Sequence, residues 1–357
     1  MLLKIRSFMQ KTFDAILPIF ATLLALIIGI FMLKSLGKNP LDAYKALFEG
    51  AFGSQRAIIQ TVIKATPLLL VGIGVCIAFR GGVVNIGGEG QIIMGALASA
   101  AVALYLPIPS RLIMIPLCLL TAMAAGAVWG GIPGFLKARM GVNEILTTVM
   151  MNSIAVYFSN FLLRGPMIDP HEIEMGTRAA QTAQMPEYTW LTRLAPPTQL
   201  NTGTILAVIL AFFAFVLLWR TTIGYRIRAV GFNSAASKYA GIKVPIYQAM
   251  AMILSGAFSG LAGGIELFGV QHRVLENISA NYGFNGIVTA LFGNLHPIGT
   301  IPAAVLFGGL MVGGNKMQRS VQVHSAFIDT LLGLVVLFVV AAKIFSTNRS
   351  KRRAKNE

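Results

Sequence analysis

The sequence predicts an all-α integral membrane protein, a polytopic bundle of about ten transmembrane helices with broken or re-entrant segments. Of its 357 residues, 55% are hydrophobic and only 12% are charged, whereas soluble domains carry about 25% charged residues. The mean hydropathy is +0.72, and charge-free stretches long enough to cross a bilayer recur along the chain. We therefore expect one transmembrane domain over residues 1–357, with the lipid bilayer as its solvent.

The expected spans are the charge-free stretches of near-spanning length. In order they are 15–33, 65–79, 92–106, 112–136, 145–163, 204–219 and 244–265. No formally charged side chain follows Asn277 until Lys316, which is too long for one helix across a core of about 30 Å. Proline and glycine around 293–299 favour a turn there, so we expect shorter helices over 285–294 and 298–312, and a last span over 327–344.

The distribution of cations predicts the topology. The basic segment 346–357 and the basic N-terminus are expected in the cytoplasm by the positive-inside rule, which requires an even number of crossings and supports ten. The loop over 220–245 is then cytoplasmic and the loop over 164–203 is external. The loop over 34–64 has an apolar spacing typical of a helix at the membrane surface. The net charge of +16 is explained by these flanking cations, and we expect no nucleic-acid partner.

Polar side chains inside apolar regions are the candidates for a substrate path. The glycine-rich stretch 81–95 carries three of them, and non-helical backbone at membrane depth survives only where it is buried in protein or lines a wet cavity. A second interrupted region, 283–299, falls in the other half of the chain, as in transporters with a site between repeats. Either substrate contact or pairing with Arg80 and the backbone explains these groups. The candidates are Asn85, Glu89, Gln91, Asn152 and Asn294.

The composition of the predicted cytoplasmic loop indicates a helix that docks onto a partner protein. Five cations and many small residues lie between Arg220 and Lys243, a composition suited to a partner's groove. The chain lacks the G-x-x-x-x-G-K-[ST] pattern of nucleotide-binding loops. It also lacks paired carboxylates, and its four histidines are scattered, so we expect no enzymatic activity, no cofactor and no metal. Energy for transport would come from a partner or from an ion gradient.

Glycines that recur every four residues predict close helix packing. Gly126 is followed by glycines at 130 and 134, Gly256 by glycines at 260 and 264, and Gly309 by Gly313. Such faces allow two helix backbones to approach each other. We interpret them as scaffold.

Three of these stretches carry a resemblance to a known family. Asn85-Ile-Gly-Gly-Glu-Gly-Gln91, Asn143-Glu-Ile-Leu-Thr-Thr-Val-Met-Met-Asn152 and Gly231-x-Asn233-x-Ala-Ala-x-x-Tyr-Ala-Gly241 resemble the permease subunits of bacterial ABC importers. The family is the branched-chain amino acid, simple-sugar and nucleoside permease superfamily, and the nucleoside (guanosine-type) branch is the most similar. The resemblance covers nearly the whole chain.

The resemblance implies a multi-pass subunit of the bacterial cytoplasmic membrane that works by alternating access. It implies a second homologous permease subunit, in a heterodimer, a cytoplasmic ABC ATPase and an extracytoplasmic substrate-binding lipoprotein. It also implies that the cytoplasmic loop is the ATPase-coupling loop, although no glutamate stands at the Glu-Ala-Ala position of related importers. The residues implied there are Arg228, Gly231, Asn233, Ala235, Ala236, Lys238, Tyr239 and Gly241.

Three substrate or mechanism classes remain open. The leading one is a nucleoside or a related small polar substrate carried by an ATP-driven permease. A simple-sugar permease of the same superfamily is the first alternative. An ion-coupled secondary transporter is the second, and it would need a core carboxylate such as Glu89 or Glu266.

Overall fold

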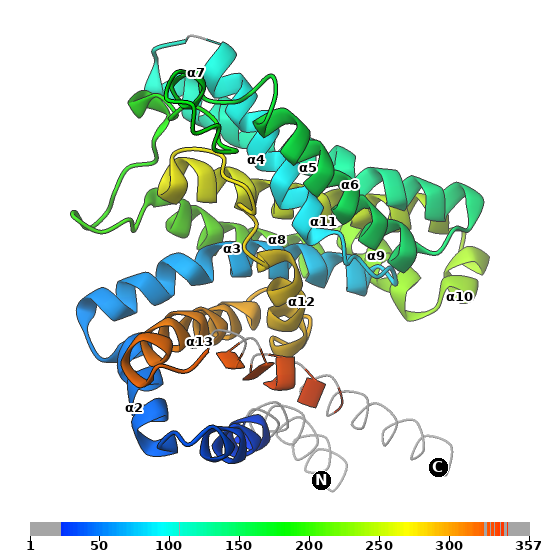
Figure 1. The fold of residues 1–357 in the computed structure, drawn as a ribbon. Coiled ribbons are helices and arrows are strands. Elements are labelled where there is room, and N and C mark those ends of the chain that lie inside the picture. The colour runs from blue at the N-terminus through cyan, green and yellow to red at the C-terminus, as the bar shows by residue number, and fades with distance from the viewer. Residues whose placement is uncertain are drawn as a thin grey trace, which may run out of the picture. The chain divides into compact units, whose positions relative to one another are not determined.

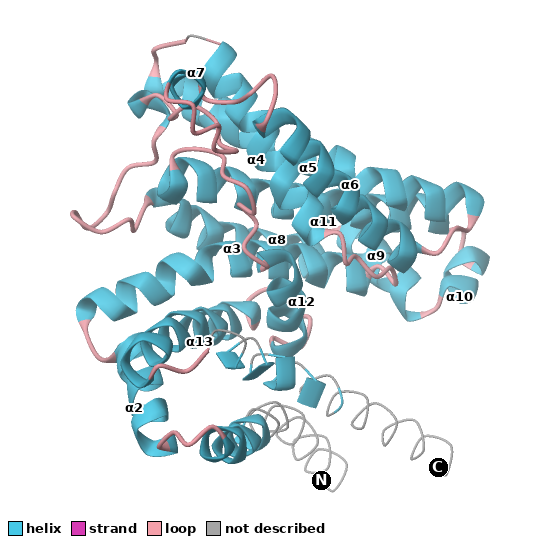
Figure 2. Cartoon of the chain, viewed as in Figure 1, coloured by secondary structure: helices cyan, strands magenta, loops and turns pink. Residues whose placement is uncertain are grey.

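Helices make up most of the described part of the chain, and loops and turns make up the rest. The computed structural model describes residues 23–106 and 108–324, with the stretches 327–328, 330–331, 333–335, 337–338 and 341 beyond them. The predicted basic tail 346–357 and parts of the first and last expected spans lie outside the described residues. Figure 2 shows helices and loops without a strand in the part that is described. Five described helices are long and apolar enough to cross a membrane, which confirms an all-α membrane protein and leaves the count of ten as a prediction.

The bounds of the helices follow the apolar stretches. An apolar helix covers Leu23–Ser35. In chain order there follow α2 (Pro40–Phe52), α3 (Gln55–Arg80), α4 (Gly88–Tyr105), α5 (Arg111–Met140), α6 (Glu144–Leu163), α7 (Pro170–Glu174), η1 (Glu187–Thr189), α8 (Thr202–Arg220), α9 (Thr222–Phe232), α10 (Ser234–Tyr239), α11 (Val244–Glu266), the π-helix η2 (Leu267–Gln271), α12 (Tyr282–Phe292) and α13 (Thr300–Val321).

Two of the predicted boundaries were wrong. The span expected over 65–79 begins at Gln55, so Lys64 lies inside a helix and does not end a surface loop. The helix expected over 298–312 continues to Val321 and contains Lys316. In both cases a cation was taken as the end of a span, although the structure gives each cation an acidic partner.

Contacts divide the chain into two compact units, one formed by residues 62–308 and the other by the residues on either side. In the 62–308 unit, helices α4, α5 and α11 pack against one another (Figure 1). Of the most apolar windows of α3 and α11, 83% of the residues are buried, against 22–28% for α5, α6 and α8. Helices α3 and α11 therefore form the core, while α5, α6 and α8 present apolar side chains outward, as lipid or a partner subunit requires.

The predicted glycine contact lies between α5 and α11. A Cβ at Gly126 would overlap the carbonyl oxygen of Gly256 and lie 2.6 Å from the Cα of Gly260. A Cβ at Gly95 on α4 would likewise lie 2.6 Å from that same Cα. Because the backbones touch, glycine is required here for space, and the predicted scaffold role is confirmed.

The other unit contains the helix predicted in the first outer loop. This helix, α2, carries Glu49, whose Oε2 accepts a hydrogen bond at 3.0 Å from Lys316 Nζ on α13. The hydrogen bond and the positive charge of Lys316 lower the pKa of Glu49. The Tyr44 hydroxyl donates to the carbonyl of Leu26 at 2.6 Å. These contacts hold α2 against α13 and against the helix Leu23–Ser35.

Candidate functional site

The glycine-rich stretch interrupts the helical path as predicted. Helix α3 ends at Arg80, α4 begins at Gly88, and the seven residues between them are not helical. Gly82 has a φ of +73°, a left-handed conformation that favours glycine. The first interrupted segment is thus real, and its backbone groups need partners other than helix bonds.

A buried amide pair supplies many of those partners. Asn85 Nδ2 donates to Gln91 Oε1 at 3.1 Å and to Ser255 Oγ at 2.8 Å. Asn85 Oδ1 accepts from the Gly87 amide at 2.9 Å and from Gln91 Nε2 at 3.2 Å. Asn85 and Gln91 are each 1% exposed. Both amides therefore fix the turn into α4, and their contact with substrate stays a prediction.

Helix α6 supports the same segment from its other side. Asn152 Oδ1 accepts from the Gly90 amide at 2.9 Å, and its Nδ2 donates to the Ile86 carbonyl at 3.0 Å. One turn earlier, Thr148 Oγ1 lies 3.4 Å from the Ile86 amide. Thr148 precedes Asn152 by four residues, so both side chains lie on one face of the helix. That spacing is the signal by which the sequence could have revealed Thr148.

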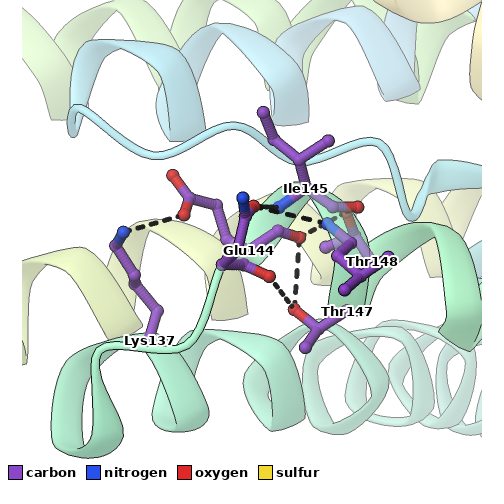
Figure 3. Close-up of polar contacts among 7 residues, drawn as sticks. Lys137, Glu144, Ile145, Thr147 and Thr148 are labelled. Carbon is purple, nitrogen blue, oxygen red and sulfur yellow. Dashed lines mark hydrogen bonds and ion pairs between the residues drawn. The ribbon is translucent and has the colours of Figure 1, made fainter.

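The start of α6 is itself held by polar contacts. Figure 3 shows Lys137, near the end of α5, pointing toward the Glu144 carboxylate, with 2.9 Å between Lys137 Nζ and Oε2. Asn143 Oδ1 accepts from the Ile145 amide at 2.9 Å, as expected of an N-cap. Asn143 is therefore the N-cap of α6, and the ion pair from Lys137 holds the start of α6 beside the end of α5.

Glu89 connects the two interrupted regions of the chain. It is the second residue of α4, and its Oε1 accepts hydrogen bonds from the backbone amides of Gly283 at 2.9 Å and Phe284 at 3.4 Å. Those amides belong to the first turn of α12, an 11-residue helix. Glu89 is 6% exposed. A carboxylate at a helix N-terminus satisfies free amides and complements the helix dipole, so Glu89 caps α12.

Glu89→Ala should lower the free energy of unfolding by about 2 kcal/mol, because the buried amide of Gly283 and the partly buried amide of Phe284 lose their acceptor. Glu89→Gln keeps an acceptor oxygen and should cost less. Hydrogen exchange at Gly283 and Phe284, with thermal unfolding of the purified protein, measures both effects. The matched control is Glu174→Ala, an exposed carboxylate of α7. Unchanged protection of the two amides in Glu89→Ala would contradict the capping role.

Asn294 lies at a different place, in the turn between α12 and α13. Asn294 and Leu295 have φ values of +58° and +53°, an uncommon pair of left-handed residues without glycine. Arg80 donates to both of their carbonyls, with Nε to Leu295 at 3.0 Å and a terminal nitrogen to Asn294 at 3.2 Å. The turn predicted here is confirmed, and Arg80, which was one of the alternatives for pairing with the polar groups of the glycine-rich stretch, donates to this turn instead.

A second ionic cluster was not predicted. Lys64 Nζ lies 2.6 Å from the Tyr282 hydroxyl and 4.0 Å from Glu266 Oε1. Gln271, at the end of the π-helix, donates to the same carboxylate oxygen at 3.2 Å. Glu266 is 2% exposed and Lys64 is 28% exposed. The buried carboxylate is therefore compensated by a cation that the sequence placed in a loop.

The predicted coupling loop folds into two short helices. Asn233 separates α9 from α10, and its Oδ1 caps α10 by accepting from the Ala236 amide at 3.0 Å. Tyr239 is 95% exposed and Phe232 is 79% exposed. Gly241 follows α10 with a φ of +78°. The loop thus presents a capped turn with two exposed aromatic side chains, Phe232 and Tyr239.

A groove of about 840 Å³ adjoins these helices. Three cations line it, Arg139 from the end of α5 together with Lys238 and Lys243, and apolar side chains such as Pro245 and Ile246 complete it. Ala235 and Gly241 also contribute to its wall. The surface is both basic and apolar, which suits a protein partner with carboxylates.

The predicted external loop packs onto the π-helix η2, which continues α11. The amide of Met185 donates to the His272 carbonyl at 2.8 Å, and the amide of Leu191 donates to that of Phe268 at 2.9 Å. The His272 ring stacks on Trp190 with 4.0 Å between centroids. Burial, and then the positive charge of Arg193, lower the pKa of His272. The loop is therefore an ordered cover at this end of the helices.

The structure brings Asn85, Gln91 and Asn152 together around one segment, with Glu89 beside them on α4. Asn294 belongs to the turn after α12. Sequence reasoning missed the side chains that complete these contacts from distant helices, namely Thr148, Ser255, Lys64 and Tyr282.

Comparison with known proteins gives a family match and several relatives. Residues 57–340 match the family described as "Branched-chain amino acid transport system / permease component". The chain is 35% identical over 328 residues to the guanosine ABC transporter permease protein NupP of Bacillus subtilis (strain 168), covering 92% of this chain and 93% of that protein. It is 33% identical to the nucleoside ABC transporter permease protein NupB of Lactococcus lactis subsp. cremoris (strain MG1363), covering 97% and 96%.

Two further relatives bear on substrate and assembly. The glucose ABC transporter permease protein TsgB13 of Haloferax volcanii is 32% identical, covering 93% of this chain and 88% of that protein. A second guanosine ABC transporter permease protein of Bacillus subtilis, NupQ, is 30% identical, covering 70% and 78%.

Proposed function

Because the chain belongs to the permease component family of the branched-chain amino acid transport systems, we propose that it is the membrane-spanning permease subunit of an ABC importer for nucleosides. The observation that carries the proposal is the family match over residues 57–340 together with similarity to the nucleoside permeases NupP and NupB. The chain has no nucleotide-binding loop of its own, so hydrolysis belongs to a partner and the subunit is not an enzyme.

Nucleosides are the proposed substrates, with simple sugars as the alternative. Two of the relatives are named for guanosine or nucleosides and a third for glucose. The candidates for the substrate path stay those predicted from the sequence. Four of them, Asn85, Glu89, Gln91 and Asn152, also hold the interrupted segments in shape through their hydrogen bonds. Substrate therefore meets a path whose walls are fixed by buried hydrogen bonds.

The exposed surfaces of the chain suggest where each proposed partner protein binds. We place a cytoplasmic ABC ATPase on the coupling loop and its basic groove, and an extracytoplasmic binding lipoprotein on the external loop. A second homologous permease would cover part of the apolar outer face, and the existence of two related guanosine permeases in one bacterium supports a heterodimer. The complex lies in the bacterial cytoplasmic membrane, with ten spans and both termini inside.

Alternating access driven by ATP is favoured over ion coupling. A secondary transporter would need a core carboxylate free to exchange a proton or ion. Glu89 accepts hydrogen bonds from two backbone amides, and Glu266 interacts with Lys64 and accepts a hydrogen bond from Gln271. Both carboxylates are thus engaged in holding helices together.

Uptake of radiolabelled guanosine tests the proposal. Cells express the chain with its genomic neighbours, with or without a Walker-lysine substitution in the neighbouring ATPase. We expect the substitution to abolish uptake and a protonophore to leave it largely unchanged. Uptake that survives the substitution and collapses with the protonophore would contradict the proposal, and competition by unlabelled glucose would favour the sugar alternative.

A further inference from the structure

Arg80 is the contact point between the coupling region and the turn after α12. It is the last residue of α3, and its guanidinium donates to the carbonyls of Asn294 and Leu295. Both of those residues have left-handed φ values, a conformation that costs free energy and persists only when its surroundings hold it. The turn between α12 and α13 therefore depends on the position of one side chain.

The same guanidinium lies over an aromatic ring of α8. The Cζ atom of Arg80 is 5.5 Å from the centroid of Trp219, and the Cζ atom of Arg228 on α9 is 5.4 Å from it. Arg228 also donates through Nε to the Leu218 carbonyl at 2.9 Å. The His296 ring lies 4.7 Å from the Trp219 ring. One indole thus contacts the coupling region, the end of α3 and the turn before α13.

The two cations at this indole make the arrangement sensitive to the position of α9. Each guanidinium is attracted to the face of the ring by a cation–π interaction, whereas the two like charges repel each other. Among the described residues no carboxylate forms an ion pair with either arginine. A displacement of Arg228 therefore changes the environment of Arg80 directly.

A backbone contact provides a second connection. A Cβ at Gly231, near the end of α9, would overlap the carbonyl oxygen of Arg80. A Cβ at Gly82 would lie 2.9 Å from the Cα of Gly231. At Gly231 the backbone of α9 touches the backbone of Arg80 and Gly82 directly, so at this point movement of α9 cannot be absorbed by a rotamer change.

We propose that Arg80 and Trp219 are positioning residues that transmit displacement of the coupling loop to the turn between α12 and α13. This inference rests on the proposed function, because it assigns the displacement to the ATPase bound at the loop. Its physical basis is a chain of direct contacts that runs from α9 through Trp219 and Arg80 to a strained turn. Loss of either side chain uncouples hydrolysis from transport while the complex still assembles.

The test compares transport with hydrolysis in the same vesicles. The chain is purified with its partner permease and ATPase, reconstituted in proteoliposomes with the binding protein, and assayed for guanosine uptake and ATP hydrolysis. For Arg80→Gln and Trp219→Leu we expect hydrolysis within about two-fold of wild type and at least a ten-fold drop in guanosine transported per ATP. Trp219→Phe keeps an aromatic face and should recover most of the coupling that Trp219→Leu loses.

The matched control is Arg56→Gln, which removes the exposed arginine at the other end of α3 and should leave the ratio unchanged. If Arg80→Gln does not co-purify with its partners, Arg80→Lys takes its place, since lysine keeps the charge but lacks the planar fork. If the guanosine transported per ATP equals that of the control in all variants of Arg80 and Trp219, the inference is overturned and the proposed function still stands. Wild-type vesicles without ATP-dependent uptake would overturn both.

Discussion

Gly126→Ala is expected to lower the free energy of unfolding by about 3 kcal/mol. The new Cβ would overlap the carbonyl oxygen of Gly256 and lie 2.6 Å from the Cα of Gly260. Neither atom belongs to a side chain that can rotate away, so α5 and α11 would have to separate, and overpacking of this kind costs about 1–3 kcal/mol. Thermal unfolding of the purified protein, with the monodisperse fraction after extraction, measures the loss.

Gly131→Ala in the same helix is the matched control. Both substitutions raise the intrinsic helix propensity by about 1 kcal/mol, but the Cβ at position 131 meets only the side chain of Ile253, with Cγ1 at 3.2 Å. We expect this variant to unfold within about 0.5 kcal/mol of wild type. Equal stability of the two variants would show that the close contact between α5 and α11 does not limit packing.

The second large effect is expected in the coupling loop. The double substitution Lys238→Glu with Tyr239→Ala should reduce guanosine uptake at least ten-fold while leaving membrane insertion unchanged. Tyr239 is 95% exposed, and exposed aromatic side chains commonly contribute most of the binding free energy of an interface. Lys238 lines the basic groove, where reversal of the charge would repel an acidic partner.

Co-purification of the ATPase, together with uptake in whole cells, reports this effect. Lys34→Glu supplies a control, since that exposed cation lies in the last turn of the helix Leu23–Ser35 and outside the loop. Normal uptake and normal recovery of the ATPase in a well-expressed double variant would contradict the assignment of this loop as the docking site of the ATPase.

Apolar spans were predictable because their length and hydropathy are local properties. The expected span 244–265 is α11 (Val244–Glu266), and the expected span 145–163 is α6 (Glu144–Leu163). The turn at Asn294 was also predictable, because proline and glycine constrain the backbone on their own. The interrupted stretch before α4 was recognised for the same reason.

Contacts between distant residues were not predictable. Lys64 looked like a loop residue because its compensating carboxylate, Glu266, lies some 200 positions away. The role of Glu89 was left open between substrate contact and pairing, and only the fold shows that the amides of Gly283 and Phe284 are its partners. A single sequence records which side chains are polar, whereas the packing of helices decides which of them meet.

The backbone contact between α5 and α11 also restricts how the protein can move. Interfaces built from interlocking side chains can switch between discrete packings by changing rotamers, but glycine rows offer no rotamers to change. Sliding of α11 along α5 would drive larger side chains such as Met252, which already lies 2.8 Å from a Cβ built at Gly134, into backbone atoms. Helices α5 and α11 should therefore move together as one rigid pair when the transporter changes conformation.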